Sequence, residues 1–144
     1  MTGPLPAEFF VAVPGLPRPQ GSKRHVGNGR MIESSPHVGP WRERVALAAR
    51  TAHGGQLDGA LRVTVCFSLP RPKGHYRTGR NAHLLREAAP DYPTSRPDLD
   101  KLTRAILDAL TGVWWADDSL VVGIDALKVY GRPGVTVRAK RVGS

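Results

Sequence analysis

The chain of 144 residues is short of cysteine, of acidic residues and of long apolar runs. Its single cysteine, Cys66, excludes an internal disulfide and a cysteine-rich zinc site, and it predicts a reducing compartment. No stretch approaches the ~20 apolar residues of a membrane-spanning helix. The first fifteen residues have neither the basic start nor the apolar length of a signal sequence. We therefore expect a soluble cytoplasmic protein with no membrane partner.

Acidic residues are scarce and unevenly placed. Lys and Arg number 21 against 12 Asp and Glu, which gives a formal net charge of +9 and a pI near 10.6. A surface this basic attracts phosphates at long range, so nucleic acid is the leading partner, ahead of a membrane surface or an acidic protein. Yet five of the twelve acids lie between Asp98 and Asp118, where only Lys101 and Arg104 are basic. The function of the chain has to account for this acidic segment.

Apolar periodicity predicts six regular elements. Strands are expected at 9–13, 61–69, 120–130 and 134–142, and helices at about 41–53 and 99–110. Two long basic loops lie between them, at about 14–40 and 70–96, and the first includes a short extended piece at 28–34. Structureless loops of this length are uncommon unless they are functional or disordered. The order predicts an α+β fold in one domain spanning 1–144, with two main helices packed as a second layer on a mostly antiparallel or mixed sheet.

The acidic segment has two interpretations. In the first, Asp98 is a helix N-cap, Asp100 complements the helix dipole, and Asp117 and Asp118 form a solvated turn. In the second, the strand that follows Asp118 doubles back beside the start of the helix and brings the acids together. An oxygen-only cluster of this kind is what hard cations such as Mg²⁺ prefer, and ions held in this way assist phosphodiester hydrolysis. The basic loops would then hold nucleic acid, and the acids would hold the ion that cuts it.

The segment from Arg96 to Tyr130 resembles the RusA family of Holliday junction resolvases, which are common among phages and prophages. The resemblance rests on RPDLDKLTRAILDAL, on WWADDSLVV and on KVY, with weaker support from PRPQGSKR and the strand at 61–69. It implies a RusA-like fold and a homodimeric, Mg²⁺-dependent endonuclease, with Mn²⁺ as an alternative ion. Such an enzyme resolves four-way DNA junctions by paired symmetric nicks in recombination and repair.

The resemblance also implies roles for individual residues. The metal ligands it implies are Asp98, Asp100 and Asp118, with Asp117 assisting. The family often has Asn where this chain has Lys101, and a functional Lys where this chain has Arg104. We expect Arg104 or Lys101 to offset charge on the phosphate, although arginine and lysine are not interchangeable at such positions. Arg104 is equally placed to bridge Asp100 and Asp108 along the helix.

Other positions carry weaker expectations. DNA contacts are expected from both basic loops. The first loop would contribute Lys23, Arg24 and Arg30, and the second would contribute Arg71, Lys73, Tyr76, Arg77 and Arg80. Tyr76 is suited to base stacking. The five histidines lack metal-ligand spacing with one another and are expected in loops and on the surface. Trp114 and Trp115 are expected in the core beneath the acidic turn, Leu107 on the side of Asp100, and Lys128 on the exposed face of an antiparallel sheet.

Two other functions stay open on the sequence alone. One is a non-catalytic, basic DNA-binding module whose acids are caps and salt-bridge partners, which would bind DNA in a salt-sensitive way without cutting it. The other is a general metal-dependent nuclease with no preference for junctions. The sequence does not separate the second from a resolvase, because structure selectivity depends on dimer geometry and on the long basic loop.

Overall fold

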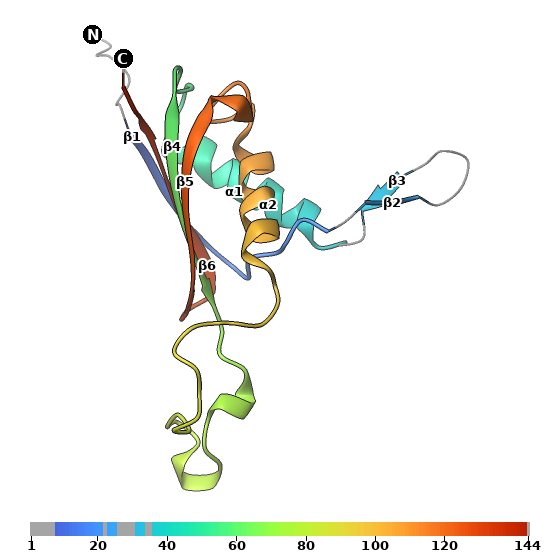
Figure 1. Ribbon diagram of the computed structural model, residues 1–144, viewed down its shortest axis with the longest axis vertical. Helices are drawn as coiled ribbons and strands as arrows, with labels where there is room; N and C mark the ends of the chain where they lie inside the picture. Colours follow the sequence, from blue (N-terminus) through green and yellow to red (C-terminus); the bar gives the residue numbers. More distant parts are fainter. Residues whose placement is uncertain (1–7, 22, 26–30, 34–35, 144) are drawn as a thin grey trace.

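The computed structural model describes residues 8–21, 23–25, 31–33 and 36–143, and it has two layers. One layer is a mixed sheet in the order β1-β6-β4-β5, made of β1 (Glu8–Pro14), β4 (Leu61–Leu69), β5 (Val121–Tyr130) and β6 (Gly134–Arg141). The other layer is a pair of helices on one face of that sheet, α1 (Val38–Ala52) and α2 (Leu99–Leu110) (Figure 1). Two short strands, β2 (Lys23–His25) and β3 (Met31–Glu33), pair with each other away from the sheet. The predicted α+β class is confirmed.

β4 lies inside the sheet because its sequence alternates along its whole length. Its inward side chains are all buried under the helices: Leu61, Val63, Val65, Phe67 and Leu69. β6 pairs with one side of β4 in the antiparallel sense and β5 pairs with the other side in the parallel sense, which makes the sheet mixed. Phe67 is fully buried, so its truncation to alanine would cost about 3–5 kcal/mol of folding free energy.

The link between β5 and β6 has to cross the end of β4, because these two strands are consecutive in the chain but not adjacent in the sheet. The Gly131 N–H donates to the carbonyl of Leu69 at 2.9 Å during this crossing. A Cβ at Gly131 would lie 2.7 Å from Ser68 Oγ. A side chain at position 131 would therefore require Ser68 to move aside.

The first helix differs slightly from the prediction. α1 begins at Val38, before the predicted start at Trp41, because Pro40 is tolerated in a first helical turn, where its missing N–H has no intrahelical partner. α1 ends at Ala52, and the next residue, His53, stacks on Phe9 with ring centroids 4.4 Å apart. His53 is a loop residue, as expected of the histidines, but its half-buried ring packs on Phe9 rather than lying open to solvent.

The two tryptophans after α2 are core residues, as predicted. Trp114 and Trp115 are fully buried, and each indole N–H has a partner. Trp114 Nε1 donates to the Ala49 carbonyl at 3.0 Å, and Trp115 Nε1 donates to Thr111 Oγ1 at 3.1 Å. These contacts fix the turn that leads into β5. Within the described residues, no helix is long and apolar enough to cross a membrane.

Candidate active site

Asp98 and Asp100 lie at the start of α2 with free carboxylates. Asp98 occupies the N-cap position in an extended conformation (φ −73°, ψ 140°), but its side chain accepts no capping hydrogen bond. Both side chains are exposed, and neither belongs to an ion pair among the residues that the structure describes. A capping bond is worth about 1 kcal/mol. Since Asp98 does not make one, helix capping does not explain why an aspartate stands there.

Lys128 fixes the backbone before Asp98. The sequence predicts this lysine on the exposed face of an antiparallel sheet. Lys128 faces the helices rather than solvent, because it pairs with the inward residue Phe67 across the parallel β4–β5 register. Its ammonium group donates to the carbonyls of Ser95 at 3.0 Å and Pro97 at 2.9 Å. The prediction of an exposed residue on an antiparallel pair is wrong. Lys128 instead positions the segment that presents Asp98.

Asp117 and Asp118 stand in the turn between α2 and β5, and they differ in what their carboxylates do. Asp117 accepts a hydrogen bond from the Ser119 N–H at 3.0 Å and caps a single 3₁₀ turn, Asp118–Leu120. This backbone bond, together with a side-chain hydrogen bond involving Asp118, lowers the pKa of Asp117. Asp118 is exposed and forms no ion pair within the described residues. Asp117 therefore shapes the turn, and Asp118 offers the freer carboxylate.

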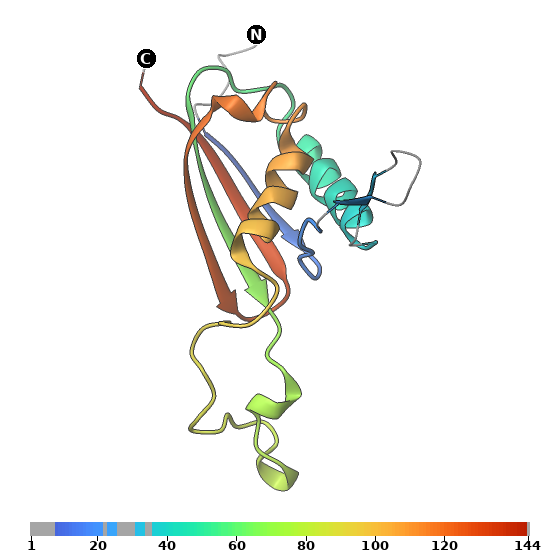
Figure 2. The ribbon, with the colours of Figure 1, turned by 45° about the vertical axis from the view of Figure 1, so that its right-hand side comes forward.

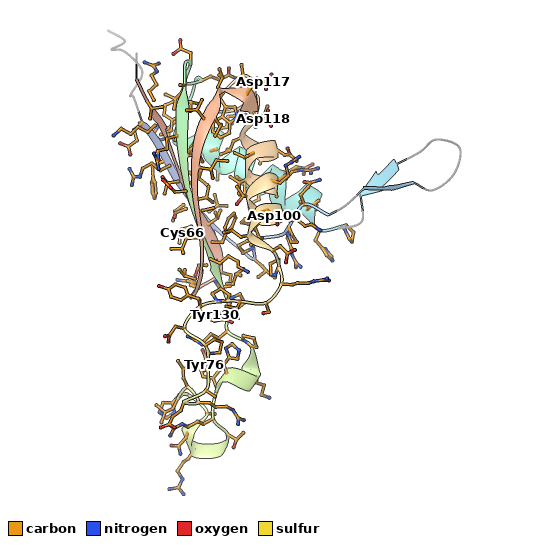
Figure 3. All side chains as sticks on the ribbon, viewed as in Figure 1. Cys66, Tyr76, Asp100, Asp117, Asp118 and Tyr130 are labelled. Carbon is orange, nitrogen blue, oxygen red and sulfur yellow. The ribbon has the colours of Figure 1, made fainter. Side chains whose placement is uncertain are left out.

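Within one chain, α2 keeps the two acidic pairs apart. A helix of 12 residues is about 18 Å long, and Asp117 and Asp118 follow its far end, as Figure 3 shows. β5 runs antiparallel to α2 (Figure 1), but the two acids precede this strand and so stay beside the end of the helix. Among the described residues, no three His, Cys, Asp or Glu side chains are grouped closely enough to hold a metal ion. One chain thus carries these carboxylates in two separate pairs.

An open apolar groove lies between α2 and the edge strand β5. Its volume is about 490 Å³, and its lining is Leu99, Asp100, Thr103, Arg104, Leu107, Ile124 and Ala126. Leu107 faces the side of Asp100, as predicted. The neighbouring β5 side chains are unusually open for apolar residues, with Val122 65% and Ile124 43% exposed. None of the ion pairs among the described residues involves Arg104, so the predicted bridge from Arg104 to Asp100 and Asp108 is not formed.

Residues 70–95, which we call the arm, project from the end of the sheet (Figures 1 and 2). The arm contains two 3₁₀ turns, Lys73–His75 and Gly79–Asn81, and an antiparallel bridge between Tyr76 and Leu85. It is anchored at its base, where the Arg71 guanidinium lies 4.3 Å from the Tyr130 ring centroid and donates to the Pro90 carbonyl at 2.8 Å. The predicted basic loop is therefore a folded projection.

Of the arm residues expected to contact DNA, some are engaged within the arm and others are exposed. Arg71 is committed to the anchor, Tyr76 is half-buried, and Arg77 Nε donates to the Leu85 carbonyl at 3.2 Å. Lys73 and Arg80 are exposed and have no hydrogen-bond or ion-pair partner within the described part of the chain. Arg30 and the side chains of Lys23 and Arg24 lie outside the described residues. Lys73 and Arg80 are thus the arm cations best placed to meet a phosphate.

Comparison with known proteins identifies the family of the chain. The family model described as endodeoxyribonuclease RusA matches residues 14–140. The chain belongs to the RusA family. A curated relative, the uncharacterized protein YqaN of Bacillus subtilis (strain 168), is 27% identical over 133 residues, which cover 87% of each chain.

Membership in the RusA family confirms the resemblance seen in the sequence. It implies a Holliday junction resolvase nuclease with branched DNA as its substrate. It therefore favours a nuclease over the non-catalytic DNA-binding module. RusA-family nucleases generally depend on a divalent metal, which is consistent with carboxylates that neither cap nor pair. The separation of those carboxylates along α2 is the feature that a function has to explain.

Proposed function

We propose that this RusA-family chain is a Mg²⁺-dependent endonuclease that acts as a homodimer and resolves four-way DNA junctions by paired nicks. The observation that carries the proposal is that the exposed carboxylates of Asp98 and Asp118, at opposite ends of α2, make no helix-capping hydrogen bond and pair with no cation among the described residues. In a chain with a net charge of +9, such acids are suited to an external positive ligand. Carboxylate oxygens are the ligands that Mg²⁺ and Mn²⁺ prefer.

A second copy of the chain would complete the ligand set. Most soluble oligomers are symmetric, and the commonest symmetry is a two-fold axis. An axis near the middle of α2 lays two copies of the helix side by side in opposite directions, so that the start of each helix meets the end of the other. Asp118 of one copy then joins Asp98 and Asp100 of the other. A dimer of this kind contains two such sites, which fits paired nicking of a symmetric junction.

The groove between α2 and β5 supplies the contact surface for this dimer. Leu99, Leu107 and Ile124 line the groove, and among the described residues no strand pairs with the outer side of the edge strand β5. Apolar side chains this open on an edge strand usually mark an interface, because burying them is favourable by about 25 cal/mol per Å².

The chain's own residues would orient the DNA around the site. Lys101 and Arg104, on the first turns of α2, would offset the charge of the phosphate that is cut. Lys128 holds the backbone that presents Asp98, and Lys73 and Arg80 on the arm would contact flanking phosphates. A divalent ion, when bound, supplies Lewis-acid stabilisation of the phosphate and activates water for hydrolysis.

A labelled synthetic four-way junction and a matched linear duplex test the proposal. Each is incubated with the protein, with Mg²⁺ or with a chelator, and the products are separated on native and denaturing gels. Symmetric nicks in the junction alone, absent with the chelator, are the expected result. Cutting of both substrates would replace the resolvase by a general nuclease. Binding without cutting under Mg²⁺ or Mn²⁺ would refute the proposal.

A further inference from the structure

A further pocket opens beside Asp98, and it shares only Asp98 and Lys101 with the residues that have a part in the proposed metal chemistry. We call it the loop–helix pocket, because it lies between the loop of residues 16–21 and the start of α2. Its volume is about 480 Å³, and its remaining lining is Leu69, residues 96–98 and Lys101. This volume falls within the range of sites that bind small ligands, about 300–1,000 Å³.

The walls of the loop–helix pocket are held by hydrogen bonds. The Gln20 N–H donates to the Lys101 carbonyl at 2.9 Å, which ties the loop to α2. Gln20 Oε1 accepts a hydrogen bond from Arg42 of α1 at 2.6 Å, which ties the same loop to the other helix. On the opposite wall, Lys128 fixes the Pro97 carbonyl. The pocket is therefore formed before any ligand arrives, so that a ligand would bind without a large ordering cost.

The lining combines an apolar base with cations. Pro17 and Leu69 are buried, and Leu16, Pro19 and Pro97 add further apolar surface. The charged side chains of the lining are Arg18, Arg96 and Lys101 against Asp98, a net charge of +2. Apolar surface suits the face of a nucleobase, and the surplus cations suit a phosphate. A nucleotide has both parts, whereas an apolar metabolite or a bare anion has only one.

We propose that the loop–helix pocket holds one unstacked nucleotide of the DNA strand, next to the phosphate that is cut. The inference rests on the proposed function, because it takes Asp98 to lie at the reaction centre. In a regular duplex, this nucleotide would first have to leave its stack and its base pair, which costs a few kcal/mol. At a branch point that cost is smaller, because pairing and stacking are already interrupted. The pocket would thus favour branched DNA over duplex.

The direct test places 2-aminopurine, a base analogue that fluoresces when unstacked, at successive positions around the branch point of a four-way junction. Each labelled junction is titrated with the protein in the presence of a chelator, so that no strand is cut. We expect one position to brighten on binding, and we expect it to adjoin the cut mapped separately with Mg²⁺. No brightening at any position, or brightening only at a position distant from the cut, would overturn the proposal.

A pair of double variants supplies the matched control. Leu16→Ala/Arg18→Ala removes one apolar and one cationic side chain from the pocket, and Leu16 is 40% exposed, so the fold should tolerate the change. Leu47→Ala/Arg50→Ala removes the same side chains from the exposed face of α1. The pocket variant should lose the fluorescence change and about tenfold in junction affinity, because it removes one apolar contact and one cation from the pocket. The control should keep both, and equal losses in the two variants would overturn the proposal.

The two proposals fail in different ways. If the wild-type protein cuts no DNA with Mg²⁺ or Mn²⁺, the proposed function fails, whatever the fluorescence shows. If the wild-type protein cuts junctions while no base brightens and the pocket variant behaves like the control, the proposed function stands and the nucleotide pocket is refuted.

Discussion

Asp100→Asn and Asp118→Asn should each be inactive alone and should regain activity when they are mixed. The reason is the length of α2, about 18 Å, which separates Asp100 from Asp118 within one chain. If each site takes Asp100 from one copy and Asp118 from the other, a mixed dimer has one site with both changes and one site with neither. A site built by one chain would instead carry one change in every copy, and mixing would restore nothing.

The size of the recovery follows from counting sites. When copies exchange freely at equal concentration, about half of the dimers are mixed, and each mixed dimer has one intact site of two. The mixture should therefore show about a quarter of the wild-type rate of first nicks. It should also give single nicks rather than resolved products, because the second site of each mixed dimer is inactive.

The assay uses an end-labelled four-way junction with Mg²⁺. Denaturing gels count the nicks, and native gels count the resolved junctions. Copies carrying two different affinity tags show, by co-purification, that exchange has taken place. A mixture that contains mixed dimers and yet stays as inactive as either variant would refute the shared site.

Three further changes test single residues. Asp98→Ala should abolish cutting. It should change the free energy of unfolding, measured with urea, by less than ~0.5 kcal/mol, because Asp98 makes no capping bond. A loss of about 1 kcal/mol or more would show that Asp98 caps the helix after all. Lys128→Met removes two hydrogen bonds to carbonyls before Asp98 and should cost about 1–3 kcal/mol in the same measurement. It should also lower kcat more than it raises KM, whereas a purely structural role would leave the kinetics of the folded fraction unchanged. Arg80→Ala should weaken junction and duplex binding alike and reduce the slope of log K against log salt by about one, and an unchanged slope would remove Arg80 from the DNA contacts.

Much of the fold could be predicted because several elements carry an uninterrupted period. β4 and α2 match the predicted ranges 61–69 and 99–110, since each keeps one apolar face from end to end and is bounded by turn-forming residues. The order of strands could not be predicted in the same way. Whether β5 pairs with β4 or with β6 depends on contacts between distant strands, and the short link 131–133 gives no sign that it crosses the end of β4.

The structure tests only the geometry of the candidate site, and Asp98, Asp100 and Asp118 stay predicted ligands. The prediction that they gather within one chain is wrong for the described residues, because it depended on where the turn after α2 ends. Alternation alone placed Lys128 on the exposed face. The signal that was missed lies in the long run VVGIDALKVY, where Lys128 falls on the apolar side of the strand. A lysine in that position needs hydrogen-bond acceptors close by.

The position of the acids gives a physical reason for the proposed dimer beyond symmetry. Each chain carries two of the proposed ligands at the start of α2 and two beyond its end, and the described part of a single chain holds no group of three such side chains. Cutting would therefore depend on dimer formation. In an isolated copy, each acidic pair would offer fewer oxygens to a divalent ion and would bind it more weakly. The apolar groove between these ends would make the contact that joins the halves, so that the same event builds both sites at once. Two sites formed together on one symmetric substrate are what paired nicking requires.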